Sequence, residues 1–384
     1  MNDLSRQLSP LLRPLKVGDF ELKNRVVMSP MTREYSPGGI PGEDVAGYYR
    51  RRAEAGVGLI ITEGVGIAHE AAVDRSSVPL LHGEAALAGW KIVVDHVHAA
   101  GGKIIPQLWH QGVLRDPVGS PRPEVAGVRP SGIWGPRDGA VSLDGDVVAR
   151  LLPETQPMSD SEIQDVIDAY ALSARNAMSI GFDGIAIHAA HGYLIDTFMW
   201  HLTNKRIDRF GGIDPRARAT FAVEVVRSIR RAVGDAKPIF FRFSQFKMQD
   251  YRARLADSPE ELGKLLIPIA EAGVDVFDGS QRYFDTPVFD GSELNLGGWA
   301  KKLTGKLAMA VGGVGLDKGQ RVHHVNAGAA PANNLGRLVE RLSKEEFDLI
   351  GIGRSLLNDP RWFERAVSGE YFLPFDDCNL SRLT

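Results

Sequence analysis

The chain has 384 residues, of which 43% are hydrophobic and 24% are charged, so it can bury a large core. Its formal net charge of −3 gives no sign of the basic surface that nucleic-acid-binding proteins carry. No apolar run is long enough to cross a bilayer, and the single cysteine, Cys378, excludes an intrachain disulfide and Cys-rich zinc or iron–sulfur sites. We therefore expect a soluble, cytoplasmic protein with no nucleic-acid or membrane partner.

Short apolar runs with strand character recur along the chain, and segments of helical spacing separate them. The strand-like runs are residues 24–31, 57–62, 103–109, 183–188, 237–243, 274–278, 306–312 and 347–353. The helical segments include residues 84–100, 159–180, 214–233 and 258–272. Eight strands that alternate with helices predict an α/β fold, a (β/α)8 TIM barrel. A doubly wound sheet shares this alternation, but the chain lacks the Gly-rich fingerprint of dinucleotide-binding sheets.

Two connections in this pattern are unusually long, and the second of them is residues 189–212, after the fourth strand. Residues 111–157, after the third strand, are rich in Pro and Gly and include short β-like runs such as 140–143. Because structureless loops of this length are rare in compact domains, we predict a small hairpin that forms a cap or lid over the barrel mouth. We expect residues 1–370 to form one barrel domain, with an additional stretch at 326–335 and a C-terminal tail at 371–384.

The fourth strand leads into a dense group of polar side chains. Residues 183–187 are typical of a buried parallel strand, and His188, His191 and Tyr193 follow directly. Parallel α/β proteins place their chemistry at the C-terminal ends of strands. Two imidazole donors and a phenolic acid suit a reaction that builds negative charge on an oxygen and then needs a proton. The alternatives are a buried structural histidine at His188 and a packing role for Tyr193.

Glycines follow the seventh and eighth strands. They form the pair Gly312-Gly313 and the segment Gly351-Ile-Gly353, which Arg354 follows. Loops at these two positions of a barrel recurrently bind a phosphate through backbone N–H groups, and an arginine adds a forked ionic contact. One such site suits a mononucleotide-like cofactor better than a dinucleotide. The alternative is that the glycines only form tight turns.

Taken together, these motifs resemble the old yellow enzymes, which are FMN-dependent ene-reductases built on a (β/α)8 barrel. The motifs are Gln107-Leu-Trp109-His110, His188-Ala-Ala-His191-Gly-Tyr193 and residues 24–33, 60–64, 203–212, 310–313 and 351–355. The resemblance implies FMN as the cofactor and NAD(P)H as the reductant. The chain departs from some members in having Thr32 where they carry a cysteine, and it lacks the iron–sulfur cysteines of the larger relatives.

The resemblance also implies roles for the residues that bind the cofactor. Thr32 corresponds to a residue that bonds flavin O4, Gln107 to the clamp on the pyrimidine edge, and Arg242 to an arginine near N1 and O2. A fixed cation at that place favours negative charge on the reduced flavin. The remaining contacts implied are the backbone of Pro30, Met31 and Gly64 and a phosphate cradle made by Gly312, Gly313, Gly353 and Arg354.

On the substrate side, the resemblance implies that His188 and His191 bind a carbonyl oxygen and that Tyr193 gives a proton to the α-carbon. The substrate is then a small α,β-unsaturated carbonyl compound whose activated C=C bond is reduced. The implied reaction is ping-pong: NAD(P)H reduces the flavin and leaves, and hydride then moves from flavin N5 to the β-carbon. We expect Trp109 to form a wall of the pocket and Tyr283 to line it from the loop after the sixth strand.

Two other classes of function stay open. His188 and His191 are spaced as a metal pair, which suits a metal-dependent barrel hydrolase with Glu63 and Asp278 as further ligands. A flavin-binding barrel without an ene-reductase role is the other class. Arg242 also has a structural interpretation, as the ion-pair partner of Asp278. A homo-oligomer is compatible with the resemblance, although the sequence shows no interface signature.

Overall fold

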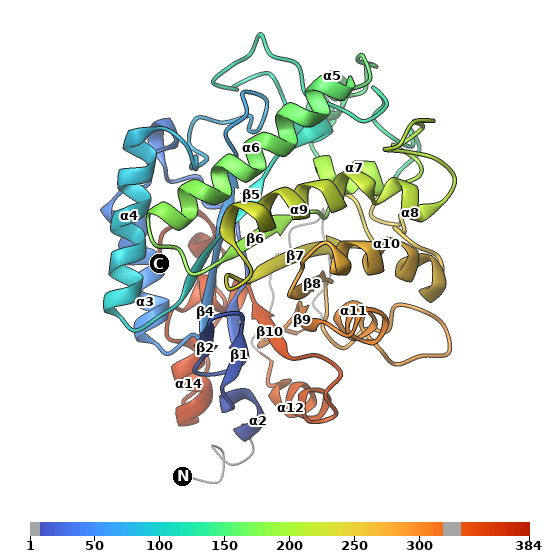
Figure 1. Ribbon diagram of the computed structural model, residues 1–384. Coiled ribbons are helices and arrows are strands. Elements are labelled where there is room, and N and C mark those ends of the chain that lie inside the picture. The colour runs from blue at the N-terminus through green and yellow to red at the C-terminus, as the bar shows by residue number, and fades with distance from the viewer. Residues whose placement is uncertain (1–7, 318–331) are drawn as a thin grey trace.

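The computed structural model describes residues 8–317 and 332–384, and its centre is a closed barrel of parallel strands (Figure 1). The strand order is β10-β3-β4-β5-β6-β7-β8-β9, so the last strand pairs with the first. The strands are β3 (Val26–Met28), β4 (Leu59–Gly66), β5 (Ile104–Trp109), β6 (Ile185–His188), β7 (Ile239–Ser244), β8 (Val276–Ser280), β9 (Leu307–Val311) and β10 (Leu349–Ile352). All eight expected strands are confirmed, and closure excludes the doubly wound alternative.

Helices surround the barrel (Figure 1). They are α2 (Ser9–Leu12), α3 (Glu43–Glu54), α4 (Glu84–Ala99), α5 (Gly145–Leu151), α6 (Asp160–Ser179), α7 (Leu194–Met199), α8 (Pro215–Arg218), α9 (Thr220–Val233), α10 (Pro259–Glu271), α11 (Leu296–Thr304), α12 (Leu335–Ser343), α13 (Arg354–Asn358) and α14 (Trp362–Ser368), with 3-10 turns η1 (Pro37–Gly39), η2 (Gly112–Leu114) and η3 (Asp377–Ser381). Local sequence explains where several begin: Ser159 and Glu162 form a capping box at α6, and Ser258 caps α10.

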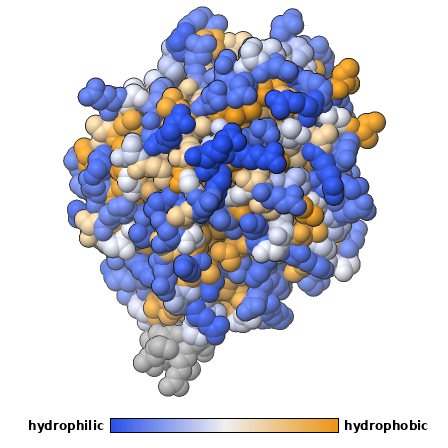
Figure 2. Space-filling view, in the orientation of Figure 1, coloured by the Kyte–Doolittle hydropathy of each residue, from blue (hydrophilic) through white to orange (hydrophobic). Residues whose placement is uncertain are grey.

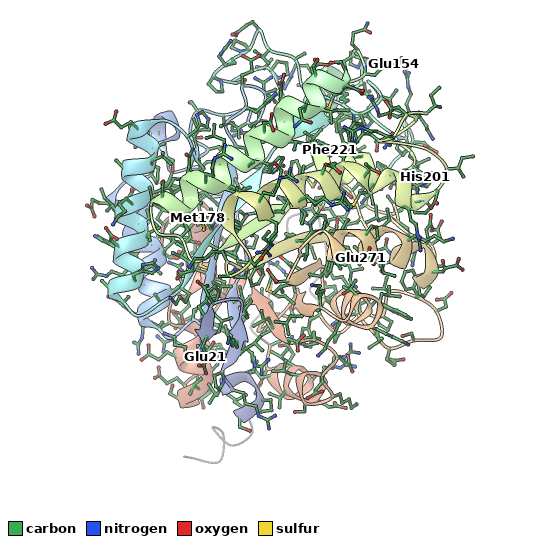
Figure 3. All side chains as sticks on the ribbon, in the orientation of Figure 1. Glu21, Glu154, Met178, His201, Phe221 and Glu271 are labelled. Carbon is green, nitrogen blue, oxygen red and sulfur yellow. The ribbon has the colours of Figure 1, made fainter. Side chains whose placement is uncertain are left out.

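The helices are fixed by apolar faces that pack on one another and on the barrel. Phe221, labelled on α9 in Figure 3, is fully buried and stacks on Phe198 of α7, with 4.1 Å between the ring centroids. The expected helical segment 214–233 is divided between α8 and α9. Asp214 caps α8 through its carboxylate, and Pro215 occupies the first turn, where a missing N–H costs no hydrogen bond.

A short antiparallel hairpin closes the N-terminal end of the barrel. Its strands are β1 (Leu15–Val17) and β2 (Phe20–Leu22). Phe20 and Leu22 pack against apolar side chains inside the barrel, whereas Glu21 between them faces solvent (Figure 3). The backbone N–H of Asp19 donates to the carbonyl of Ala236, just before β7. The sequence did not indicate this hairpin, because strands of three residues are too short to show a period of two.

The long connection after β5, for which we predicted a cap, contains no hairpin, so that part of the prediction is wrong. Residues 111–157 are all described, and none of them lies in a strand; α5 and η2 are their regular elements. The β-like run at 140–143 instead bonds to the loop after β7: Ser142 N–H donates to Met248 O, and Tyr251 N–H donates to Ala140 O. These backbone groups are therefore already paired outside the cap. Val113, Leu114, Trp134 and Leu151 form its small apolar core.

The C-terminal tail, residues 371–384, lies against the loop after β3 and against α3. The guanidinium of Arg33 donates to the carbonyls of Leu380 and Arg382 at 2.7 and 2.9 Å, and Arg51 donates to Leu383. Most of the stretch expected at 326–335 lies outside the described residues, and α12 begins at Leu335.

The surface mixes hydrophilic and apolar residues. On the face shown in Figure 2, apolar residues occur in small groups scattered among hydrophilic ones. Within the described ranges, no helix is both long enough and apolar enough to span a bilayer.

Candidate active site

Two adjoining cavities lie at the C-terminal ends of the barrel strands, and Pro30 and Arg242 line both of them. The smaller cavity, of about 120 Å³, is lined by Pro30, Thr32, Gly64, Gln107, Trp109, His188, His191, Tyr193 and Arg242. The larger, of about 390 Å³, includes among its lining residues Pro30, Met31, Arg242, Tyr283, Gly312, Gly313, Gly353 and Arg354. The structure therefore brings every residue that the sequence singled out for the site to one of the two cavities.

His188, His191 and Tyr193 form one wall of the smaller cavity. His188 ends β6, and its ring centroid lies 5.2 Å from that of His191 and 4.7 Å from that of Tyr193. Trp109, at the end of β5, stacks on His188 and meets Tyr193 edge-on, and it lines the same cavity. The three polar side chains are thus packed close enough to contact a single small ligand.

The backbone at His191 adopts an unusual conformation that other residues hold in place. His191 has φ 64° and Gly192 has φ 84°, both in the left-handed region. Ser244 Oγ accepts the His191 N–H at 2.9 Å, and Met248 N–H donates to the His191 carbonyl at 3.0 Å. A backbone conformation of this kind is favoured at functional sites when the surroundings over-determine it.

A buried ion pair supports the same turn. Lys247 Nζ lies 2.6 Å from Asp196 Oδ1, and both side chains are fully excluded from solvent. The other carboxylate oxygen of Asp196 accepts the N–H of Gly192, and Lys247 also donates to Ser244 O. The pair therefore joins the segment after β6 to the loop after β7, and the backbone of Lys247 bridges that of His191.

Burial sets the protonation states of the three polar side chains. Burial lowers the pKa of both His188 and His191 well below the usual value, and the nearby positive charge of Arg242 acts in the same direction. Burial raises the pKa of Tyr193. At neutral pH the two imidazoles are therefore neutral N–H donors, and the phenol keeps its proton.

Arg242, on β7, pairs with a carboxylate and still reaches the cavities. Its Nη1 donates to Asp278 Oδ2 at 2.8 Å and its Nη2 donates to Ser280 Oγ at 3.0 Å. The structural interpretation of Arg242 as the partner of Asp278 is therefore confirmed. Because the guanidinium also lines both cavities, it contributes a fixed positive charge to the site.

The loop that carries Thr32 is anchored by a buried carboxylate. Glu63, on β4, accepts the backbone N–H groups of Arg33 and Glu34 at 2.8 and 3.0 Å through one oxygen. Glu34 has φ 60°, so this anchor fixes a left-handed conformation two residues after Thr32. Burial raises the pKa of Glu63 to about 7, although the backbone N–H donors and Arg33 oppose it.

The residues present fit a flavin mononucleotide. Ser29 Oγ and Gln107 Nε2 are buried at the cavities and have no hydrogen-bond partner among the described residues, as expected for groups that serve a polar ligand. Gly312 has φ 117° and Gly313 has φ 69°, and a Cβ atom on Gly312 would lie 2.4 Å from Gln281 O. Only glycine is tolerated there, beside the side of the cavity that Arg354 lines.

Several lining residues were not found in the sequence. Phe246 and Tyr251 come from the loop after β7, and Leu380 comes from the C-terminal tail. Phe246 stacks on His191 with 4.9 Å between the ring centroids. The position of Phe246 just beyond β7 was the one available signal, whereas Leu380 lies far from any strand end and gave none.

The metal-dependent alternative required a third ligand beside His188 and His191. The two candidates for this third ligand, Glu63 and Asp278, already have other partners. Glu63 bonds to the loop that carries Thr32, and Asp278 bonds to Arg242. In the part of the chain that the structure describes, no group of three His, Cys, Asp or Glu side chains is arranged to hold a metal ion.

Known proteins share both the sequence and the fold. A sequence model of the NADH:flavin oxidoreductase / NADH oxidase family matches residues 10–371. The chain is 36% identical over 268 residues to 12-oxophytodienoate reductase 2 of Arabidopsis thaliana, which covers 70% of this chain and 69% of the relative. It is 32% identical over 371 residues to chanoclavine-I aldehyde reductase of Penicillium roqueforti, with 96% and 92% covered. Its fold is similar to that of morphinone reductase in complex with tetrahydroNAD, at a TM-score of 0.78, 26% identity and coverage of 96% and 93%.

The barrel and its two cavities thus define a flavin-dependent oxidoreductase. The chain belongs to the NADH:flavin oxidoreductase / NADH oxidase family, which is the family of the old yellow enzymes. FMN is its cofactor and NAD(P)H its reductant. The expectations of family, barrel fold and cofactor drawn from the sequence are confirmed.

Proposed function

We propose that this enzyme reduces the activated C=C bond of small α,β-unsaturated carbonyl compounds. The observation that carries the proposal is the wall of the smaller cavity, where two neutral imidazoles and a protonated phenol face one space. His188 and His191 hold the carbonyl oxygen of the substrate by N–H donation. Tyr193 gives its proton to the α-carbon.

The two imidazoles stabilise negative charge that develops on the carbonyl oxygen during reduction. Preorganised donors in a site without bulk water contribute about 3–4 kcal/mol each to such a transition state. Neutral rings serve this purpose because they donate without an imidazolium having to be buried, and burial keeps both rings neutral. General acid catalysis by Tyr193 contributes roughly 10²–10⁴ in rate.

The residues that line the two cavities would hold different parts of the cofactor. FMN, when bound, supplies the hydride that reaches the β-carbon of the substrate. Arg242 contributes positive charge beside the ring system. The ring is held by Pro30, Met31, Thr32, Gly64 and Gln107, and the phosphate by Gly312, Gly313, Gly353 and Arg354.

We also infer that residues 1–370 act as one FMN-binding unit, in which reductant and substrate use the same space in turn. Trp109 and Tyr283 then shape the pocket around the substrate. The names of the relatives support the substrate class, because an oxophytodienoate, a morphinone and an aldehyde all carry a carbonyl group.

Isotope labelling tests the proposed reaction directly. The holoenzyme is given 2-cyclohexenone and NADPH in D₂O, and the product is analysed by mass spectrometry and NMR. The proposal predicts cyclohexanone with one deuterium on the α-carbon. When NADPH is replaced by the reductant deuterated at C4 of the nicotinamide, in H₂O, deuterium is expected on the β-carbon. Formation of the allylic alcohol, or no turnover of any activated alkene, would overturn the proposal and favour a flavin-binding role without ene reduction.

A further inference from the structure

We propose that Ser280, at the end of β8, is a positioning residue that holds His191 in the tautomer with its proton on Nδ1. The inference deepens the proposed function, because it names the nitrogen of His191 that faces the substrate oxygen. Its structural part, the tautomer, does not depend on which substrate the enzyme reduces.

A chain of hydrogen bonds leads from a carboxylate on β8 to the imidazole. Asp278 accepts from Arg242 at 2.8 Å, Arg242 donates to Ser280 Oγ at 3.0 Å, and Ser280 Oγ lies 2.9 Å from His191 Nε2. Asp278, Arg242 and Ser280 are buried. The register of the barrel explains the chain, because Arg242 and Asp278 are directly paired between β7 and β8, and Ser280 is the next residue on the same face of β8.

The direction of each bond follows from what each group carries. A guanidinium only donates, so Ser280 Oγ accepts from Arg242. The one hydroxyl proton of Ser280 needs an acceptor, and among the described residues His191 Nε2 is the one within reach. If His191 donated instead, that buried hydroxyl proton would be left unpaired, which is the costlier arrangement. Nε2 is therefore the acceptor.

A neutral imidazole then carries its single proton on Nδ1. The groups that face His191 from the neighbouring elements are Arg242, Lys247 and His188, and the positive charges among them oppose an imidazolium. No described residue bonds to His191 Nδ1, and the side chain is only partly buried. Because the ring lines the smaller cavity, Nδ1–H is the donor that remains for a ligand. Phe246, stacked on the ring, holds its plane.

The neighbouring histidine has the opposite tautomer. The backbone N–H of Ala190 donates to His188 Nδ1 at 3.4 Å, so His188 carries its proton on Nε2. The two histidines thus offer one Nε2–H and one Nδ1–H to the same cavity. The proposal therefore predicts different tautomers for the two rings, and this difference depends on Ser280.

Long-range ¹H–¹⁵N spectra of holoenzyme labelled with ¹⁵N-histidine read the tautomers without any turnover. The variant His191→Asn assigns the His191 signals by their loss. We expect the Nδ1–H pattern for His191 in the wild type, a shift to Nε2–H in Ser280→Ala, and the wild-type pattern in Ser280→Thr, which keeps the hydroxyl. Ser228→Ala, at a buried serine on α9 that lines neither cavity, is the matched control.

A wild-type His191 with its proton on Nε2, or a pattern unchanged in Ser280→Ala, would overturn the proposal. The wild-type spectrum decides this even if Ser280→Ala does not fold. A second readout is the affinity of the oxidised holoenzyme for 4-hydroxybenzaldehyde, whose phenolate oxygen takes the place of the substrate oxygen. Ser280→Ala should weaken it about tenfold, the value of one hydrogen bond, and Ser280→Thr should restore it. An Nδ1–H tautomer without alkene reduction would refute only the proposed function.

Discussion

At the scale of single residues, Tyr193 is the proposed source of the proton, and its burial beside Trp109 and His188 keeps that proton in place. Tyr193→Phe removes the acid but keeps the ring and its packing. We expect NADPH to reduce the flavin of this variant at the wild-type rate, and reoxidation by 2-cyclohexenone to be slower by about 10²–10⁴.

Stopped-flow absorbance under nitrogen measures the two half-reactions separately. Tyr170→Phe is the matched control, because Tyr170 is a fully buried tyrosine on α6 whose hydroxyl has no partner among the described residues. Equal losses in both half-reactions of Tyr193→Phe would show that the residue supports the cavity and does not act as the acid.

Glu63 gives a prediction about stability and pH. Its folded pKa of about 7 lies above the ordinary value of 4.5, so the folded state binds the proton more tightly than the unfolded state. Its contribution to stability is therefore complete below pH 4.5 and is lost as the pH rises through 7. Glu63→Gln lacks this titration. The free energy of unfolding of the variant, relative to wild type, should rise by roughly 3 kcal/mol over that window.

Urea unfolding followed by circular dichroism at several pH values measures this difference. Glu84→Gln, at an exposed position on α4, controls for the general effect of losing one carboxylate. Parallel stability curves for wild type and Glu63→Gln would refute the raised pKa. The result matters for function because Glu63 anchors the turn after Thr32.

At the scale of elements, the loop after β7 supports the segment after β6 through the Lys247–Asp196 pair. Lys247→Met leaves the carboxylate of Asp196 buried without its cation, which typically costs about 3–5 kcal/mol. We expect that loss in urea unfolding, and a smaller loss in the double variant Lys247→Met/Asp196→Asn, in which no charge is left buried. Arg252→Met, which removes an exposed cation from the same loop, should cost less than about 1 kcal/mol. A loss equally small in Lys247→Met would mean that the pair does not stabilise the turn.

The elements differ in how well the sequence predicts them. The eight barrel strands are short apolar runs and α6 carries its own capping box, so local sequence was sufficient for them. The run at 140–143 was expected to pair within the cap, but it bonds to residues 248 and 251, more than 100 positions away. The sequence around residues 140–143 contains no pattern that indicates a partner so far along the chain. The β1–β2 hairpin was missed for a different reason, since its strands are too short to show a pattern.

For the candidate site as well, the sequence predicted some residues and missed others. His188, Arg242 and Gly313 were found because parallel strands bring their C-terminal ends together, so order along the chain predicts position in space. Ser280 was missed, although it ends β8, because its role depends on a hydrogen bond to His191 in the segment after β6. Leu380 was missed because the tail reaches the cavity through contacts with Arg33.

At the scale of the whole molecule, the two ends of the barrel have different roles. Its N-terminal end is closed by the β1–β2 hairpin, and its C-terminal end holds both cavities. The larger cavity, where we propose that the cofactor binds, adjoins the one lined by His188, His191 and Tyr193, and Arg242 lines both. A reductant and a substrate that need the same space must therefore bind one after the other, which is the basis of the proposed two-step reaction.

An anaerobic absorbance titration tests this central claim most directly. The purified holoenzyme is titrated first with NADPH and then with 2-cyclohexenone, while the flavin absorbance is recorded. We expect the flavin absorbance to be bleached by about one equivalent of NADPH and to recover fully on addition of the enone. A flavin that is bleached by NADPH but stays bleached with this and other activated alkenes would contradict the account.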